Sequence, residues 1–477
     1  MIEKLKDKNL LFYLSIILAC LCSVYAGLAD LVYYWQRDLG EQIIKNFDFN
    51  YSRKQIWGTI GVSEYYDHEW LCNILFYLFS LIPYKPLFFL KFAISLVTGL
   101  SFVRFIKAEN KEYSDLQKIE ILLIILIYSS VLLKIKAYSI SVIFFMEEIV
   151  LLKKYKNNPS KVYFLRLLLL CIFWNNFHSG SILLFFAVAG VYWIVYFRNI
   201  KVLVYGIICL LSTLINPYGY KLVLFNLSHN FNSVMKQVVQ DWKPIDAKET
   251  YGVLIAIFLV VFFVNYIYSK KKNLEYLFLS FIFFFMSLGS ARHIIYLIPL
   301  SIIIIGDSRI KKDLRYNYMP YVSFGLCILF LLNSYSVLAN KDYDAIYAMD
   351  YVSDELANLL KETNKDSSDG LFNDVSFVYT CDYEAKNFVT GGFPLVESRC
   401  LDSSVLLRYA SVTSIESIID YYDLNKIVFS KWCADVEYYT LENPLYDYLN
   451  SSDKYVKLYD DDFLVYFVDR SLGYEVE

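Results

Sequence analysis

Residues 252–268 read GVLIAIFLVVFFVNYIY, a run of 17 residues without a single charged side chain. A helix needs about 17–25 such residues to cross the roughly 30 Å hydrocarbon core of a bilayer. Comparable runs recur in the first 338 residues, at 10–28, 87–103, 119–133, 179–197 and 319–338. One run would be compatible with a cleaved signal peptide, whereas this series predicts a polytopic membrane protein.

The charge of the chain changes sign near residue 339. Residues 1–338 contain 34 Lys and Arg against 21 Asp and Glu, whereas residues 339–477 contain 11 against 27. We therefore predict a membrane domain over 1–338 and an acidic domain over 339–477. No Walker-type glycine loop is present, so nucleotide-driven transport has no support. No nucleic-acid partner is expected.

Lys and Arg predict the orientation, because short basic loops stay in the cytoplasm. Eleven spans place six basic clusters and the N-terminus inside, and the acidic domain outside the cytoplasm, in a multi-pass protein of the cell membrane. The predicted spans are 10–28, 87–104, 119–133, 137–152, 162–177, 179–197, 201–216, 252–269, 275–289, 292–306 and 319–338.

One apolar segment does not fit this alternation. Trp70–Ile82 has only 13 residues and is followed by Pro83 and Pro86. We interpret it as a re-entrant or interfacial helix. The alternative is a short tilted span, which would leave one basic loop on the wrong side.

The acidic domain is predicted to be a small extracytoplasmic α/β domain, because strand-like and helix-like segments alternate in it. The expected strands are 375–381, 394–399, 426–430, 455–459 and 463–469, with a hairpin turn at 460–462. The expected helices are 345–363, 403–409, 414–422 and 441–450.

The predicted first external loop, residues 29–69, carries acidic and aromatic side chains at both ends. Asp30 follows the first span directly, where a carboxylate can act as general base on a hydroxyl group. Trp35 offers a flat apolar surface to a sugar or a lipid headgroup. His68 and Glu69 close the loop. The alternative is an ordinary interfacial belt of aromatic and solvated acidic residues.

Two further polar sites fall on the same predicted side of the membrane. Asn176 and His178 interrupt apolar sequence, and polar groups at such a depth are costly unless they are paired or face a wet cavity. Arg292 and His293 form a cationic pair at the end of another span. The arginine can bind a phosphate through its planar fork, or it can merely extend to the membrane surface.

The cysteines favour neither a metal nor a cofactor. Six of the nine lie in or beside apolar segments and are predicted to be small core residues. Cys381, Cys400 and Cys433 lie in the external domain, where a disulfide can form, and Cys381–Cys400 is the weakly preferred pair. No cofactor is expected, and a divalent metal is left open without support.

The motifs follow a fixed order along the chain: Asp30…Trp35…Gly40-Glu41, His68-Glu69-Trp70-Leu71, Asn176-Phe177-His178-Ser179-Gly180, Asn216-Pro217-Tyr218-Gly219, Asp241-Trp242-Lys243-Pro244 and Arg292. This series resembles the GT-C superfamily of polytopic glycosyltransferases that use polyprenyl-phosphate sugars. The first motif of that group usually reads Asp-Pro-Asp-x-Trp-Trp-His. Here Val32 replaces its second Asp, which argues against a metal-binding carboxylate pair and leaves Asp30 as the base.

The resemblance implies an inverting membrane glycosyltransferase. Asp30 would deprotonate an acceptor hydroxyl, with Glu69 beside His68 as the rival base, and Arg292 with His293 or His178 would hold the lipid phosphate. The other expected substrate-binding residues are Asn176, Trp35, Asp241 and Trp242. The expected partners are a polyprenyl-phosphate-linked sugar, a glycan or lipid-linked acceptor, and the bilayer. The alternatives are a polysaccharide polymerase or ligase that uses lipid-diphosphate oligosaccharides, and a non-enzymatic transporter or flippase.

Overall fold

The computed structural model describes residues 8–24, 32–47, 49, 66–230, 244–246, 248, 250–269, 272–314, 317–339, 354–363, 370–373, 415–417, 419–420, 424–430, 444–461 and 464–474. These residues fall into two compact units. The first contains the helices of residues 8–24, 68–226 and 250–339. The second contains helix α2 (Val32–Asn46) and the described part of the C-terminal region.

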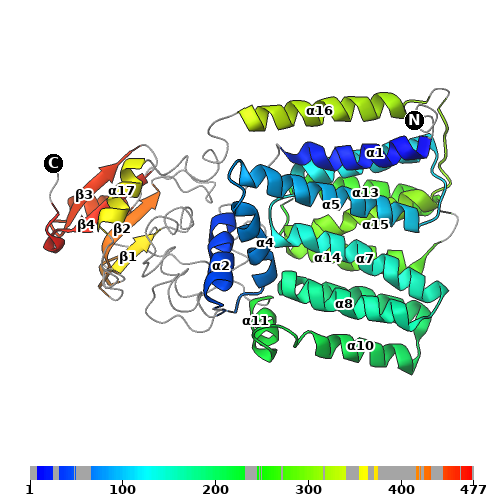
Figure 1. Cartoon of the computed structure of the whole chain (residues 1–477), viewed down its shortest axis with the longest axis horizontal. Coiled ribbons are helices and arrows are strands. Elements are labelled where there is room, and N and C mark those ends of the chain that lie inside the picture. Colours follow the sequence, from blue (N-terminus) through cyan, green and yellow to red (C-terminus); the bar gives the residue numbers. More distant parts are fainter. Residues whose placement is uncertain are drawn as a thin grey trace. The chain divides into compact units, whose positions relative to one another are not determined.

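The first unit is a bundle of long helices that run side by side (Figure 1). In chain order the elements are α1 (Lys8–Leu21), η2 (Cys22–Val24), α4 (Trp70–Ser80), α5 (Pro86–Ala108), α6 (Asp115–Ile127), η3 (Tyr128–Leu132), α7 (Ala137–Asn157), α8 (Lys161–Phe177), η4 (Ser179–Ser181), α9 (Ile182–Tyr192), η5 (Trp193–Phe197), α10 (Ile200–Ser212), α11 (Tyr220–Asn230), α13 (Thr250–Ile267), α14 (Leu274–Gly289), η7 (Ala291–Tyr296), α15 (Leu297–Asp307) and α16 (Met319–Ala339).

Each of the eleven predicted spans overlaps at least one of these helices. Within the described residues, four helical segments are long and apolar enough to cross a membrane: 86–108, 179–197, 250–267 and 319–339. Shorter apolar helices lie at 9–24, 70–80, 200–212 and 274–289. The helical, membrane-type character is therefore confirmed, and the number of spans stays a prediction.

Small polar side chains join the helices of the bundle. Ser15 of α1 contacts Ser323 of α16 at 2.7 Å between hydroxyl oxygens, and Ser23 contacts Ser95 of α5 at 2.8 Å. A Cβ added to Gly99 would lie 3.0 Å from the backbone of Ile17. Helices in apolar surroundings associate through small residues and interhelical hydrogen bonds. These contacts therefore hold α1 between α5 and α16.

The short helix α4 confirms the expected helix after Glu69. It ends at Ser80, close to Pro83, and Pro86 occupies the first turn of α5. Proline is tolerated in a first helical turn because its missing N–H would have no partner there. In contrast, α2 lies inside the predicted first external loop, where no helix was expected.

Ion pairs tie several helices together at the end of the bundle where α5, α7 and α15 finish. The ammonium nitrogen of Lys111 lies 2.8 Å from an Asp307 carboxylate oxygen and 3.1 Å from one of Glu109. Lys153 of α7 also pairs with Glu109, whose side chain is 2% exposed. We call Glu109, Lys111, Lys153 and Asp307 the lysine network.

The second unit contains a four-stranded sheet in the order β1-β2-β4-β3. Its strands are β1 (Gly370–Asn373), β2 (Leu424–Ser430), β3 (Tyr455–Asp460) and β4 (Leu464–Asp469). β1 is parallel to β2, and the other pairs are antiparallel. The strands expected at 426–430, 455–459 and 463–469 are thus confirmed, whereas those expected at 375–381 and 394–399 lie outside the described residues.

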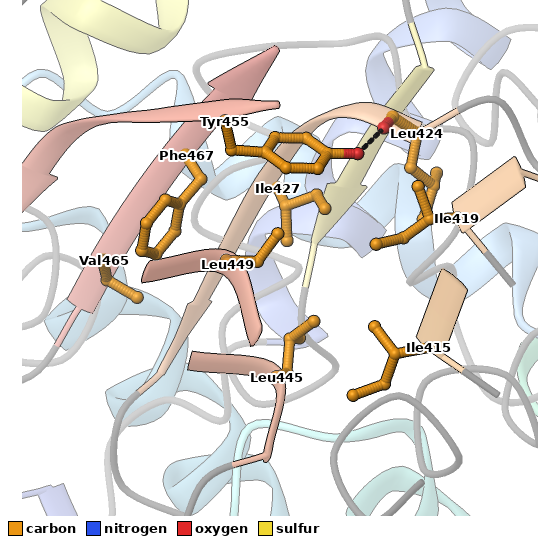
Figure 2. Packing of buried hydrophobic residues seen from close by; sticks show 9 residues of the cluster. All are labelled: Ile415, Ile419, Leu424, Ile427, Leu445, Leu449, Tyr455, Val465 and Phe467. Atoms are coloured by element: carbon orange, nitrogen blue, oxygen red, sulfur yellow. Dashed lines mark hydrogen bonds between the residues drawn. The ribbon is translucent and has the colours of Figure 1, made fainter. Parts of the chain in front are cut away.

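Helices cover both faces of this sheet. Along β4, Leu464, Tyr466 and Val468 pack with α17 (Asp354–Thr363). Val465 and Phe467 point to the other face, where α21 (Pro444–Ser451) packs (Figure 2). Alternate residues of a strand face opposite sides, so a strand covered on both faces is apolar throughout. The expected helices at 345–363 and 441–450 correspond to α17 and α21, residues 415–417 and 419–420 of the expected 414–422 are helical, and 403–409 lies outside the described residues.

Candidate active site

The candidate site lies where two chain segments meet at helix ends. α8 ends at Phe177, and His178 follows it with an extended backbone that leads into η4. Glu69 stands directly before α4, and its carbonyl accepts the first hydrogen bond of that helix, from Asn73. The backbone N–H of Ser179 donates to the carbonyl of His68 at 2.8 Å. This bond fixes the start of α4 against the break between α8 and α9.

A carboxylate and two imidazoles meet at this junction. One Glu69 oxygen lies 3.4 Å from Nε2 of His178 and 3.7 Å from Nε2 of His68. The exposed fractions of the three side chains are 17%, 8% and 12%, in the order Glu69, His178, His68. The centroids of the two imidazole rings lie 6.4 Å apart. His68, Glu69 and His178, three of the predicted site residues, therefore lie next to one another, and their roles stay a prediction.

The other face of His178 is held by a hydrogen-bond relay. Its Nδ1 lies 2.7 Å from the hydroxyl of Ser141 on α7. The indole N–H of Trp174 donates to the hydroxyls of both Ser141 and Ser181, and Ser181 donates to the carbonyl of His178. When Ser141 donates to Nδ1 rather than to the Ala137 carbonyl 3.4 Å away, the imidazole proton lies on Nε2, toward Glu69. The tautomer of a histidine follows from such partners.

Burial and nearby positive charge act on His178 together. Burial lowers the pKa of His178 well below its ordinary range, and His68, Arg292 and His293 lower that pKa further. Burial disfavours the charged form of an imidazole, and so do neighbouring cations. The neutral form is therefore favoured at neutral pH, in agreement with the relay. Its Nε2–H faces Glu69.

Arg292 and His293 lie in η7, the short helix between α14 and α15. Both side chains are half-buried, and the N–H of His293 donates to the carbonyl of Ser290. η7 packs against α7, the helix that carries Ser141, and both cations lower the pKa of His178. We call His68, Glu69, His178, Arg292 and His293 the histidine cluster.

Asn176 connects three parts of the chain at this site. Its side-chain oxygen accepts a hydrogen bond from the indole N–H of Trp70 at 2.9 Å. Its amide nitrogen donates to the carbonyls of Ile172 and Ile215, at 2.8 and 2.9 Å. Both amide protons and the oxygen therefore have partners in the protein. In this structure Asn176 positions α4 against α8 and α10.

A second amide relay lies beside the first. Ser179 donates to the side-chain oxygen of Asn175 and accepts a hydrogen bond from Asn226 of α11, at 2.9 and 2.6 Å. Gly180 touches both imidazoles: a Cβ added there would lie 3.5 Å from His68 and 3.6 Å from His178. A larger side chain at Gly180 would therefore extend into the space of the histidine cluster.

Four predicted site residues are not placed by the described structure. Asp30, Asp241 and Trp242 lie outside the described residues, and for Trp35 only the backbone within α2 is described. Cys381, Cys400 and Cys433 also lie outside them. Among the residues that the structure does describe, no group of three His, Cys, Asp or Glu has a geometry suited to a metal ion.

Sequence reasoning missed Ser141 and Asn226, which hold His178 and Ser179 in place. Both residues lie in helices, and neither stands in a dense polar motif. Ser141 is preceded by Ser139 in an otherwise apolar stretch, a weak signal that many membrane helices share. Only the fold places these residues next to the break between α8 and α9.

The comparisons with known proteins bear on the fold. No family model and no curated protein matches this sequence. A solved structure of the archaeal oligosaccharyltransferase AglB from Archaeoglobus fulgidus, in complex with an inhibitory peptide and a dolichol-phosphate, matches with a TM-score of 0.53. The match has 10% sequence identity and covers 88% of this chain and 69% of that chain. The fold thus resembles that of this oligosaccharyltransferase.

Proposed function

We propose that this protein is an integral membrane glycosyltransferase that moves a sugar from a polyprenyl-phosphate donor to an extracytoplasmic glycan or lipid-linked acceptor. The observation that carries the proposal is the histidine cluster, in which one carboxylate faces two imidazoles beside an arginine. It lies in a fold similar to that of an oligosaccharyltransferase whose structure was solved in complex with an inhibitory peptide and a dolichol-phosphate.

The proposed reaction is an inverting displacement. The acceptor hydroxyl attacks the anomeric carbon, the bond from that carbon to the phosphate oxygen breaks, and the phosphate leaves with the electron pair. A carboxylate takes the hydroxyl proton. Asp30 keeps its predicted role as this base on the strength of the motif resemblance, and Glu69 is the rival. The position of Glu69 supports it as a candidate, because its carboxylate lies 3.4 and 3.7 Å from two imidazoles.

Arg292 and His293 are proposed to hold the phosphate of the donor. Negative charge develops on the leaving phosphate as the glycosidic bond breaks, and fixed positive charge at that position lowers the barrier. Asn176 is proposed to act indirectly, since its amide is occupied by Trp70 and two carbonyls. Trp35, Asp241 and Trp242 remain proposed contacts to the substrate.

The test uses purified protein with a panel of radiolabelled polyprenyl-phosphate sugars and cell-envelope glycan as acceptor. Asp30→Asn keeps the shape of the side chain and removes its basicity, so transfer should fall by about 10²–10⁴-fold, the usual effect of losing a general base. Glu69→Gln is the matched variant. If Asp30→Asn transfers at the wild-type rate while Glu69→Gln is inactive, Glu69 is the base.

The same assay distinguishes the polymerase or ligase alternative. That alternative requires the wild-type protein to leave every monophosphate-linked sugar unused and to join diphosphate-linked oligosaccharides. A protein that uses neither class of donor, although it is folded and monodisperse, would contradict the proposed function.

A further inference from the structure

A second site lies far from the histidine cluster, between α7, α8, α9–η5 and α10. These helices enclose a cavity of about 280 Å³ with an almost entirely apolar lining. The cavity extends along α9 and η5 from Phe185 to Phe197, a distance of about 18 Å at 1.5 Å per residue. Its shape therefore suits a hydrocarbon chain.

Aromatic side chains line the end of the cavity that lies away from the histidine cluster. The ring of Tyr155 meets that of Phe197 edge to face at 5.4 Å, and Phe164 stacks on Tyr205 at 3.8 Å between centroids. Trp193 completes this wall. Tyr and Trp concentrate where a membrane protein passes from hydrocarbon to headgroup level. The aromatic wall thus marks the depth of the lipid headgroups.

Room for a ligand comes from two glycines in the cavity wall, Gly190 of α9 and Gly206 of α10. A Cβ added to either would meet no atom within 4 Å. These positions leave unfilled volume that a larger residue would occupy without a clash.

The exposed charges at this end of α8, η5 and α10 are all positive, whereas Glu109, Glu148 and Glu275 nearby are buried. From Ile149 to Gln240 the sequence contains no Asp or Glu. The same end of the four helices carries Lys154, Lys156, Lys161, Arg198 and Lys201. Lys161, Arg198 and Lys201 are exposed at the first residue of α8 and on either side of the start of α10. Lys153, by contrast, is already paired with Glu109 in the lysine network.

We propose that this cavity binds one acyl chain of an anionic glycerophospholipid, with the headgroup against Lys161, Arg198 and Lys201. An apolar channel that ends in an aromatic wall and a cluster of cations matches both parts of such a lipid. Basic pockets between membrane helices bind anionic headgroups, and each Lys or Arg near the surface adds to the attraction. The site is separate from the proposed glycosyl-transfer site, which lies at the opposite ends of α8 and α9.

The experiment is native mass spectrometry of the full chain, released from detergent that contains equal amounts of dioleoyl phosphatidylglycerol and dioleoyl phosphatidylcholine. We expect one phosphatidylglycerol to stay bound in preference to phosphatidylcholine. Gly206→Leu should abolish this retention, because the new side chain fills the cavity. Gly325→Leu on α16 is the matched control, since a Cβ there also meets no atom within 4 Å and Gly325 is not part of the cavity wall.

A second variant tests the headgroup without changing the packing. Lys161→Gln with Lys201→Gln should weaken phosphatidylglycerol binding by roughly thirtyfold, as expected for the loss of two cations near the headgroup. Equal retention of the two lipids by the wild type would overturn the proposal. So would equal phosphatidylglycerol retention by Gly206→Leu and Gly325→Leu. If Gly206→Leu does not purify as a folded protein, the double lysine variant decides the question.

Discussion

The two ends of the helical bundle handle charge in opposite ways. In the lysine network, Glu109 and Asp307 pair with Lys111 and Lys153, and the contacts of Lys111 to the two carboxylates are 2.8 and 3.1 Å long. In the histidine cluster, Glu69 faces two imidazoles at 3.4 and 3.7 Å. The first set of distances is that of ion pairs with good geometry, and the second is longer than a normal N–H···O hydrogen bond.

The lysine network consists of ion pairs that stabilise the fold, whereas the histidine cluster contains groups that can exchange a proton. A buried ion pair with good geometry is costly to break, because removing one partner leaves the other charge buried alone. A buried histidine that stays neutral can still donate or accept a proton. The number of charged residues therefore does not distinguish the two ends of the bundle, whereas the distances between these residues do.

The largest expected effect concerns which end of the bundle is exposed outside the cell. Asp453→Cys places a thiol on an exposed turn of the C-terminal unit, and Asn158→Cys places one in the exposed turn between α7 and α8. We expect a membrane-impermeant maleimide to label the first in intact cells and the second only after lysis, relative to the unsubstituted chain. The reverse pattern would place the histidine cluster in the cytoplasm and contradict the proposed outward site.

The next largest effect should come from the lysine network. Glu109→Gln leaves Lys111 and Lys153 without their shared carboxylate, and breaking a buried ion pair in this way costs about 3–5 kcal/mol. We expect a marked loss of stability in denaturation of the purified protein in detergent. Glu41→Gln is the control, because Glu41 forms an exposed pair with Lys45 on α2, and such pairs contribute about 0.3–0.5 kcal/mol. Equal stabilities of the two variants would show that the network is not structural.

A smaller effect is expected at the phosphate-binding position. Arg292→Lys keeps the charge and loses the planar fork, and hydrogen bonds to charged groups contribute about 1.5–3 kcal/mol. Turnover should therefore fall by at least about tenfold, since about 1.36 kcal/mol on the barrier corresponds to a factor of ten. Arg309→Lys, at an exposed arginine after α15, is the control. Unchanged turnover and donor affinity in Arg292→Lys would reduce Arg292 to a membrane anchor.

Much of this fold could be predicted from the sequence because its signals are local. Uninterrupted apolar runs mark the helices, and Pro83 and Pro86 mark the end of α4. The apolar strands β2, β3 and β4 also stand out, since each has β-branched or aromatic residues between turn residues. In contrast, α2 is too polar to stand out in a loop, and β1 has only four residues, Gly370–Asn373.

Only part of the candidate site could be predicted, because the contacts that support it join residues far apart in the sequence. His68, Glu69 and His178 stand out because they are polar residues beside apolar segments. The supporting contacts, from Ser141 to His178 and from Trp70 to Asn176, join residues that are 37 and 106 positions apart. Their partners depend on which helices are neighbours, and a single sequence carries no information on that point. The same holds for the acids of the lysine network, Glu109 and Asp307.

The smallest expected effect is a pH dependence of stability that comes from His178. Its pKa in the folded protein lies well below the ordinary value of about 6.5. Well above pH 6.5 the imidazole is neutral in both the folded and the unfolded chain, so it contributes nothing to the pH dependence of stability. As the pH falls below about 6.5, the unfolded chain binds a proton that the folded chain does not, so stability decreases by up to about 1.36 kcal/mol per pH unit. We expect the melting temperature to fall between pH 7.5 and 5.5, and to fall less in His178→Gln, which cannot bind that proton. Identical pH profiles for the two proteins would mean that folding does not change the pKa of His178. A wild-type protein that gains stability, relative to His178→Gln, as the pH falls would mean that the pKa is raised and that the Nε2 to Glu69 contact is an ion pair like those at the other end of the bundle.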